Sequence, residues 1–192
     1  MQRSSVGALV VAVVLIVAGV ARGAILDEAI RGDLPNTGAT PVQWTLEAGD
    51  NLLAGSAGTS AVTGPDYDLV TLNIPAGLEL RSLFLTKHEI DFGLSFMGWQ
   101  YGAMWTAGYG TLVDGNQLFR YQLFDKNYIG FDLLFDIDLP SGAYTIELQD
   151  IHVPYNYGFT FRVVAVPEPG MAALAAGAAL AFGCIRRGRH LV

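Results

Sequence analysis

Cysteine and histidine are scarce in this chain of 192 residues. The single cysteine, Cys184, lies in an apolar segment near the C-terminus, so the region before it forms no internal disulfide bond. His88 and His152 have no cysteine near them, and a zinc site of the usual Cys and His composition is therefore not expected. Ordinary hydrophobic packing has to hold the fold together.

Positive charge is also scarce, with 11 Lys and Arg against 18 Asp and Glu and a formal net charge of −7. Five of the basic residues lie in the two ends of the chain. The region 25–165 keeps 6 basic and 17 acidic residues, a balance of −11. Nucleic-acid binding depends on clustered Lys and Arg, so nucleic acid is excluded as a partner. The balance favours solubility, repulsion from anionic surfaces or cation binding.

Residues 1–24 have the layout of a secretory signal peptide. Arg3 supplies the positive charge, and 6–20 is the apolar segment. Small residues follow, and Ala21 and Gly23 at positions −3 and −1 predict cleavage after Gly23. The alternative is an uncleaved N-terminal anchor. In both cases the region that follows is exported.

The last segment, 166–192, has three parts. Pro167, Glu168 and Pro169 break regular structure, because two prolines fix φ and remove backbone donors. An uncharged run follows over 170–185, which as a helix of about 1.5 Å per residue spans roughly 24 Å and is short for a permanent membrane span. A basic cluster ends the segment and stays on the cytoplasmic side. It consists of Arg186, Arg187 and Arg189.

This arrangement resembles the PEP-CTERM sorting signal of bacterial surface proteins, which are processed by a membrane transpeptidase-like exosortase. The resemblance implies that 170–185 holds the chain in the inner membrane during sorting and that processing occurs near Glu168. The product would then lie at the cell surface or in an extracellular polysaccharide matrix. The alternative is an ordinary single-span anchor behind a proline-rich hinge.

Between these segments, 25–165 has the size of one domain of 141 residues. Hydrophobic residues alternate with period two, which predicts an all-β, antiparallel β-sandwich of about 8–9 strands, flanked by an N-terminal signal helix and a C-terminal transmembrane-type helix. We expect a loop over 49–64, and Glu147 and Arg162 on solvent faces. Strands are predicted at 42–48, 67–74, 78–86, 92–97, 104–106, 117–124, 131–137, 144–149 and 159–164.

Four stretches of this region, 51–56, 66–77, 139–146 and 157–164, resemble the bacterial pre-peptidase C-terminal domain. That family is a small β-sandwich of jelly-roll type attached to secreted enzymes and surface proteins. The resemblance implies the same jelly-roll-like fold here. The middle of the region, 89–138, departs from it by being longer and more aromatic.

No catalytic motif is complete, and we predict that the protein is not an enzyme. The stretch 55–58 lacks the spacing of a Gly-x-Ser-x-Gly nucleophile elbow. His88 and Glu89 are not followed by a second histidine at helical spacing. A Ser-His-Asp triad assembled from distant strands is the alternative that sequence leaves open.

Acidic residues near turns make calcium the cofactor to consider, because hard cations bind carboxylate and carbonyl oxygens. No stretch has the spacing of an EF-hand, and solubilising acids are the competing interpretation. The candidate ligands are Asp66, Asp68, Asp136 and Asp138. Asp114 and Asp132 also lie near predicted turns.

The stretch 96–109 is the most aromatic part of the domain. If it is extended, its four large rings share one face and could form a platform for sugar rings, which makes a carbohydrate-binding module the alternative function. The competing interpretation is that the rings pack in the core. The residues are Trp99, Tyr101, Trp105 and Tyr109.

Overall fold

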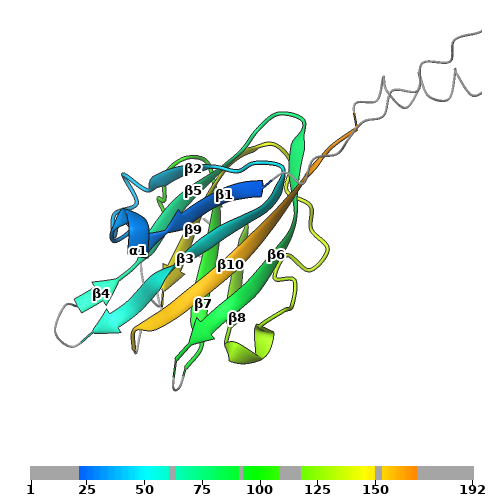
Figure 1. Cartoon of the computed structure of the whole chain (residues 1–192). Coiled ribbons are helices and arrows are strands. Elements are labelled where there is room, and N and C mark those ends of the chain that lie inside the picture. Colours follow the sequence, from blue (N-terminus) through cyan, green and yellow to red (C-terminus); the bar gives the residue numbers. More distant parts are fainter. Residues whose placement is uncertain (1–21, 61–63, 91–92, 109–117, 150–152, 168–192) are drawn as a thin grey trace, which may run out of the picture.

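The computed structural model describes residues 22–60, 64–90, 93–108, 118–149 and 153–167, which form two β-sheets packed face to face (Figure 1). One helical turn, α1 (Glu28–Arg31), and one 3₁₀ turn, η2 (Lys126–Tyr128), accompany the strands. In chain order the strands are β1 (Arg22–Asp27), β2 (Val42–Thr45), β3 (Gly49–Ser60), β4 (Gly64–Asp66), β5 (Asp68–Ile74), β6 (Leu78–Glu89), β7 (Ser95–Tyr101), β8 (Arg120–Phe124), β9 (Gly142–Gln149) and β10 (Tyr155–Ala165).

The first sheet has the order β1-β3-β10-β6, with β4 paired to the end of β3, and the second has the order β2-β5-β9-β7-β8. The prediction of an all-β, sandwich-like domain is confirmed. The prediction of purely antiparallel pairing is wrong, because β1 pairs with β3 in parallel and β2 pairs with β5 in parallel. Neither pair is joined by a hairpin. The chain crosses from β1 in the first sheet to β2 in the second, which allows each edge strand to run parallel to its neighbour.

The central strand of the first sheet, β10, shows the predicted period of two most clearly. Tyr157, Phe159 and Phe161 are buried, whereas Asn156 and Arg162 are exposed, as expected for a strand with one face on the core. The Phe161 ring meets Trp44 of the second sheet edge to face, with ring centroids 5.6 Å apart. Alternating apolar residues of both sheets thus make one continuous core.

Three local predictions are wrong. The expected loop over 49–64 contains the 12-residue strand β3, whose small residues fit between β1 and β10. The alternating stretch 131–137 is a turn-rich segment, because the Oδ1 atom of Asp132 accepts hydrogen bonds from the backbone N–H groups of Leu83 and Leu134, each at 2.9 Å. The stretch 104–106 is also not a strand, since β7 ends at Tyr101.

The outer face of the second sheet is covered by the segment 102–108, which we call the covering loop. The hydroxyl of Thr145 donates to the carbonyl of Gly102 at 2.8 Å, and that of Thr71 donates to the carbonyl of Ala103 at 3.2 Å. This cover explains why β9 is buried on both faces. It also corrects one prediction, since Glu147 is fully buried, whereas Arg162 lies on a solvent face as expected.

The two described ends of the domain lie at the same end of the first sheet (Figure 1). Arg22 at the start of β1 is opposite Asp50, and Val163 near the end of β10 is opposite Gly49. None of the helices in the described part of the chain has the length and apolar character needed to cross a bilayer. The predicted signal helix within 1–24 falls largely outside the described residues, as does the transmembrane-type helix of 170–185.

Candidate functional site

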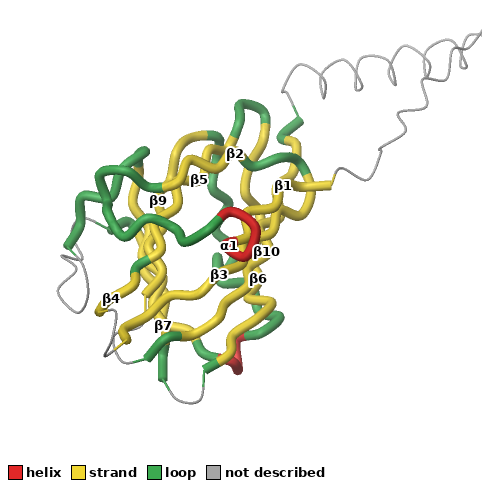
Figure 2. The backbone as a smooth tube through the Cα atoms, turned by 60° about the vertical axis from the view of Figure 1, so that its left-hand side comes forward, coloured by secondary structure: helices red, strands yellow, loops and turns green. Residues whose placement is uncertain are grey.

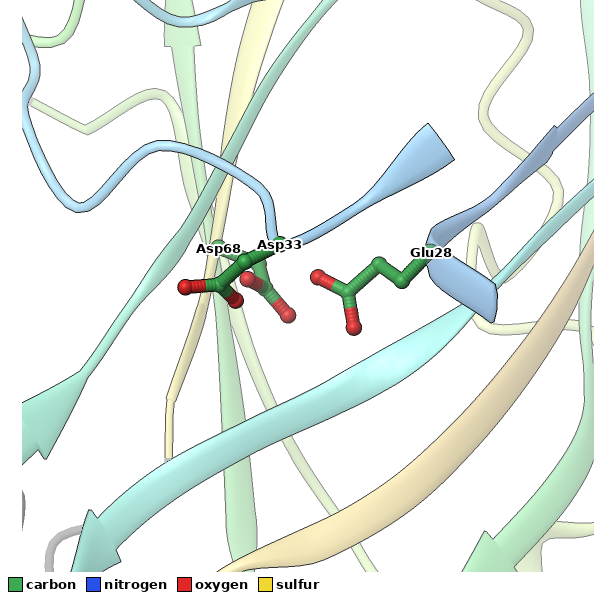
Figure 3. Close-up of side chains that lie close together, drawn as sticks. All are labelled: Glu28, Asp33 and Asp68. Atoms are coloured by element: carbon green, nitrogen blue, oxygen red, sulfur yellow. The ribbon is translucent and has the colours of Figure 1, made fainter. Parts of the chain in front are cut away.

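Three carboxylate side chains from separate parts of the chain converge near α1, and we call them the acidic cluster (Figure 3). Glu28 belongs to α1, Asp33 to the loop that follows it, and Asp68 to β5 of the second sheet. Each contributes an oxygen, and these oxygens all lie within 4.8 Å of one another. Figure 2 shows α1 as a single turn against the sheets, next to β3. The fold therefore brings acids from α1, the loop after it and the second sheet to one place.

Backbone N–H groups fix the position of Glu28. Its Oε1 atom accepts from the N–H of Leu34 at 3.0 Å, and its Oε2 atom accepts from the N–H of Ser56 at 2.7 Å. Asp27 caps α1 by accepting from the N–H of Ala29 at 2.9 Å. Leu34 is buried, so the loop between α1 and β2 is anchored to the core. Two backbone N–H donors therefore hold the carboxylate of Glu28 in place.

Asp68 is fully buried where the two sheets meet. Its Oδ2 atom accepts a hydrogen bond of 2.6 Å from the hydroxyl of Tyr157, which comes from β10 in the opposite sheet. Its Oδ1 atom is buried and has no hydrogen-bond partner among the described residues. Burial raises the pKa of Asp68 to about 9, and the negative charge of Glu28 adds to the effect. At neutral pH, and without a cation, this carboxyl group holds a proton.

Asp66 lies two residues before Asp68, where the chain passes from β4 in the first sheet to β5 in the second. Burial raises the pKa of Asp66 to about 6, with a further contribution from the charge of Asp33. The side chain of Asn36 accepts a hydrogen bond from the backbone N–H of Tyr67 between the two acids. The loop after α1 is thus tied to the crossover between the sheets.

A pocket of about 560 Å³ opens beside the acidic cluster, lined by Glu28, Asp33, Ser56 and Tyr157 among others. Gly55 keeps this space open. A Cβ atom at that position would lie 2.4 Å from the hydroxyl oxygen of Tyr157 and 2.5 Å from the Oε2 atom of Glu28, far closer than atoms pack. Glycine is therefore required for Glu28 and Tyr157 to approach each other at this point of β3.

One positive side chain also lines the pocket. Lys87 of β6 forms an ion pair with Glu89, with 2.9 Å between its Nζ atom and the carboxylate. Its charge is shared with an acid outside the cluster. The acidic cluster consequently keeps an excess of negative charge that its Tyr157 and backbone N–H donors only partly offset.

The four calcium candidates from sequence divide between two places. Asp66 and Asp68 lie at or beside the acidic cluster, but Asp136 and Asp138 lie in the segment that runs along β6, where Asp138 pairs with Arg81 at 3.0 Å. Sequence reasoning missed Glu28, Asp33 and Tyr157. No local spacing identifies them, because Glu28 and Asp68 are 40 positions apart and meet only where the two sheets pack together.

Trp99 and Tyr101 share a face of β7, but Trp105 does not join them there. Trp99 is 1% exposed in the core between the sheets, and Trp105 is 4% exposed in a second cluster with Leu69 and Ala107. The expectation of one extended aromatic face is therefore wrong, because the chain turns after Tyr101. The Tyr101 ring is 66% exposed and stacks on Phe119 at 4.3 Å. Tyr109 lies outside the described residues.

A histidine and a serine do lie within hydrogen-bond distance, as a hydrolase would need. The Nε2 atom of His88 on β6 and the Oγ atom of Ser95 on β7 are 2.9 Å apart. Ser95 is fully buried and His88 is 5% exposed, with the ring of Phe124 against the imidazole. The pair links β6 of the first sheet to β7 of the second. His152 lies outside the described residues.

The described part of the sorting segment ends at Pro167. The N–H of Val166 donates to the carbonyl of Gly77 at 2.9 Å, so the sandwich still binds the chain one residue before the first proline. Pro167 has no N–H group to continue such pairing. The remaining sorting residues, Glu168, Pro169, Arg186, Arg187 and Arg189, lie outside the described residues.

Chemically, the acidic cluster offers hard oxygen ligands and shared protons. Its described members include no thiol or imidazole. In comparisons with known proteins, no family model, curated protein or solved structure matches the chain.

Proposed function

We propose that this is an exported, non-enzymatic protein of the cell surface or extracellular matrix, sorted through a C-terminal PEP-CTERM signal by an exosortase. The observation that carries the proposal is the position of the two ends of the sandwich. Ile25 near the start of β1 is opposite Leu52, and Val163 near the end of β10 is opposite Gly49, so both ends of the domain lie at the start of β3.

This arrangement suits a domain that is held by its C-terminal segment. A membrane segment over 170–185 would hold the sandwich by the end that carries Gly49 and Asp50. The C-terminal ends of β3 and β6, at the opposite end of the first sheet, would then point away from the bilayer. The last backbone hydrogen bond described before Pro167 is that of Val166, so the Pro-Glu-Pro motif begins directly where the fold releases the chain.

The non-enzymatic part of the proposal is supported by the burial of Ser95 and His88. A nucleophile has to reach the substrate, and a serine with no exposed surface does not. We also infer that the sandwich is of jelly-roll type, similar to the pre-peptidase C-terminal domain. Two five-stranded sheets joined by repeated crossings between them support this inference.

Carbohydrate binding is a second candidate, and exposed rings at the β7–β8 edge of the second sheet favour it. Tyr101 and Tyr121 are 66% and 63% exposed, and Tyr121 stacks on Phe96 with ring centroids 6.2 Å apart. These rings would contact an extracellular polysaccharide in place of the buried tryptophans. Retardation of the protein in gels that contain the host's own polysaccharide, and its loss in Tyr101→Ala, would test this candidate.

Mass spectrometry of the mature protein from its host tests the main proposal. We expect a form that begins at Ala24 and lacks 171–192. A Glu168→Ala variant should accumulate uncut in the membrane, whereas Glu47→Ala, which changes an exposed acid on the folded domain, should be processed normally. An abundant mature form that retains 171–192 would mean that the segment is a stable anchor and that exosortase processing is wrong.

A further inference from the structure

We propose that Glu28, Asp33 and Asp68 form a calcium-binding site, which ties the segment between β1 and β2 to the second sheet. The inference goes beyond the proposed function and depends only on the described side chains. Three carboxylates, one of them far from the other two in the sequence, converge at this point of the fold.

The geometry of the acidic cluster matches the size of a calcium ion. Ca²⁺ binds oxygen ligands at about 2.3–2.6 Å, so two oxygens on one ion lie no more than about 5 Å apart. The oxygens of Glu28, Asp33 and Asp68 satisfy this limit, since all lie within 4.8 Å of one another. Carboxylates facing a common space, as in Figure 3, repel each other unless protons or a cation lie between them.

A second and independent observation is the unsatisfied oxygen of Asp68. This side chain is fully buried, and its Oδ1 atom has no hydrogen-bond partner among the described residues. A buried carboxyl oxygen that no donor reaches is costly, and such groups in proteins usually have a ligand or a role. The neighbouring group is the carboxylate of Glu28, which Asp68 can bond only through a proton or a cation between them. Tyr157 already occupies the other oxygen and orients the carboxylate toward Glu28 and Asp33.

The pocket provides the access and the space that an ion needs. It is lined by Glu28, Asp33 and Ser56, and Gly55 contributes no side chain that would fill it. Asp33 is exposed, so one side of the site faces water and further ligand positions can be completed by water molecules. Such a site, with few protein ligands, resembles in chemistry the weak calcium sites of extracellular modules, with dissociation constants of about 10⁻⁴–10⁻³ M.

Binding would have a defined structural effect. Glu28 begins α1 and Asp33 follows its end, whereas Asp68 begins β5 in the second sheet. An ion held by all three connects β1, at the edge of the first sheet, to the second sheet. Calcium should therefore stabilise the folded state and protect the N-terminal part of the domain from local opening.

Thermal unfolding of the full-length chain in detergent, with EDTA or with CaCl₂ up to about 10 mM, tests the site. We expect the unfolding temperature to rise with CaCl₂ and to saturate, and Asp68→Asn to lose the rise. Glu147→Gln is the matched control, because it also replaces a fully buried carboxyl group of the second sheet by an amide. It should keep the full response to calcium.

A second variant keeps the test decisive if Asp68→Asn does not fold. Asp33 is exposed, so Asp33→Asn should fold normally and still lose most of the calcium response. An unfolding temperature of the unchanged protein that does not respond to CaCl₂ overturns the proposal, as does an Asp33→Asn variant that responds fully. An equal response to MgCl₂ at the same concentration overturns the assignment to calcium.

Discussion

Asp68 and Glu147 are both fully buried acids of the second sheet, but they point to opposite faces of it. Asp68 on β5 faces the first sheet, where Tyr157 donates to it and two further carboxylates approach. Glu147 on β9 is directly opposite Leu69 on one side and Gly98 on the other, and lies on the outer face under the covering loop.

The surroundings of the two acids differ in kind. Neither carboxyl oxygen of Glu147 has a hydrogen-bond partner among the described residues, and its pKa is raised to about 8 by burial. At Asp68, burial and the charges of neighbouring acids raise the pKa, and the hydrogen bond from Tyr157 lowers it in part. A buried acid on which other polar groups converge indicates a binding site, whereas an isolated one lowers stability when it ionises.

The largest expected effect comes from removing the cover over Glu147. Trp105 is buried in the cluster that contains Leu69, and its ring lies against Gly98, where a Cβ atom would be only 2.7 Å from it. Trp105→Ala should lower the free energy of unfolding by about 3–5 kcal/mol near pH 5. Urea unfolding measures this loss.

The loss should be smaller near pH 8, because water admitted by the cavity would hydrate the ionised Glu147. Tyr101→Ala, which removes an exposed ring, is the control. If the two variants lose the same stability, the covering loop does not protect Glu147 as described.

Glu147→Gln should stabilise the protein at neutral pH. The folded protein holds the Glu147 proton up to about pH 8, whereas an ordinary glutamate loses it near 4.5. The contribution of Glu147 to stability is therefore most favourable below about pH 4.5 and falls as the pH rises toward 8. At pH 7 the cost is about 3 kcal/mol, from 1.36 kcal/mol per pKa unit.

The variant should thus exceed the unchanged protein by about this amount at pH 7 and match it near pH 4. Urea unfolding at the two pH values measures the difference. Equal stability of the two proteins at both pH values would show that Glu147 is hydrated in solution.

The smallest effect is expected at Asp50, an exposed acid. Its pKa is shifted in the opposite direction to those of Asp68 and Glu147. Arg162 donates two hydrogen bonds to its carboxylate, at 2.8 and 3.1 Å, and this lowers the pKa of Asp50. The stabilisation is present at neutral pH and is lost as the pH falls through that lowered pKa. Asp50→Asn should cost less than about 1 kcal/mol, because both side chains are about half exposed.

A double-mutant cycle with Arg162→Gln at low and high NaCl concentration measures the coupling between Asp50 and Arg162. Salt should reduce it. A coupling above 2 kcal/mol, or one that salt does not change, would mean that this pair is shielded from solvent.

Much of the fold follows from alternation in the sequence. Strands β5, β6, β9 and β10 were predictable because hydrophobic side chains recur at every second position and turns with Pro or Gly precede several of them. β3 was not, because its glycines and serines have no strong strand preference and are in place only through their pairing with β1 and β10. The burial of Glu147 could not be predicted from β9 alone, because the covering loop that buries its face of the sheet comes from another part of the chain.

Only the part of the candidate site near β5 was predictable from the sequence. Asp66 and Asp68 beside a strand are a local signal for a cation site. Glu28 and Asp33 fall in a stretch with no recognisable motif, and Tyr157 looks like any other core aromatic on β10. Pairing between distant strands brings these residues together, and one sequence by itself carries no record of such pairing.

The position of β10 has a consequence for how the protein is made. This strand is the last of the described fold, yet it lies between β3 and β6, so Asn51 contacts Phe161 across 110 positions. A chain synthesised or threaded from its N-terminus cannot close the first sheet until nearly all of the domain has emerged. The order of the strands thus delays completion of the first sheet until its final strand arrives.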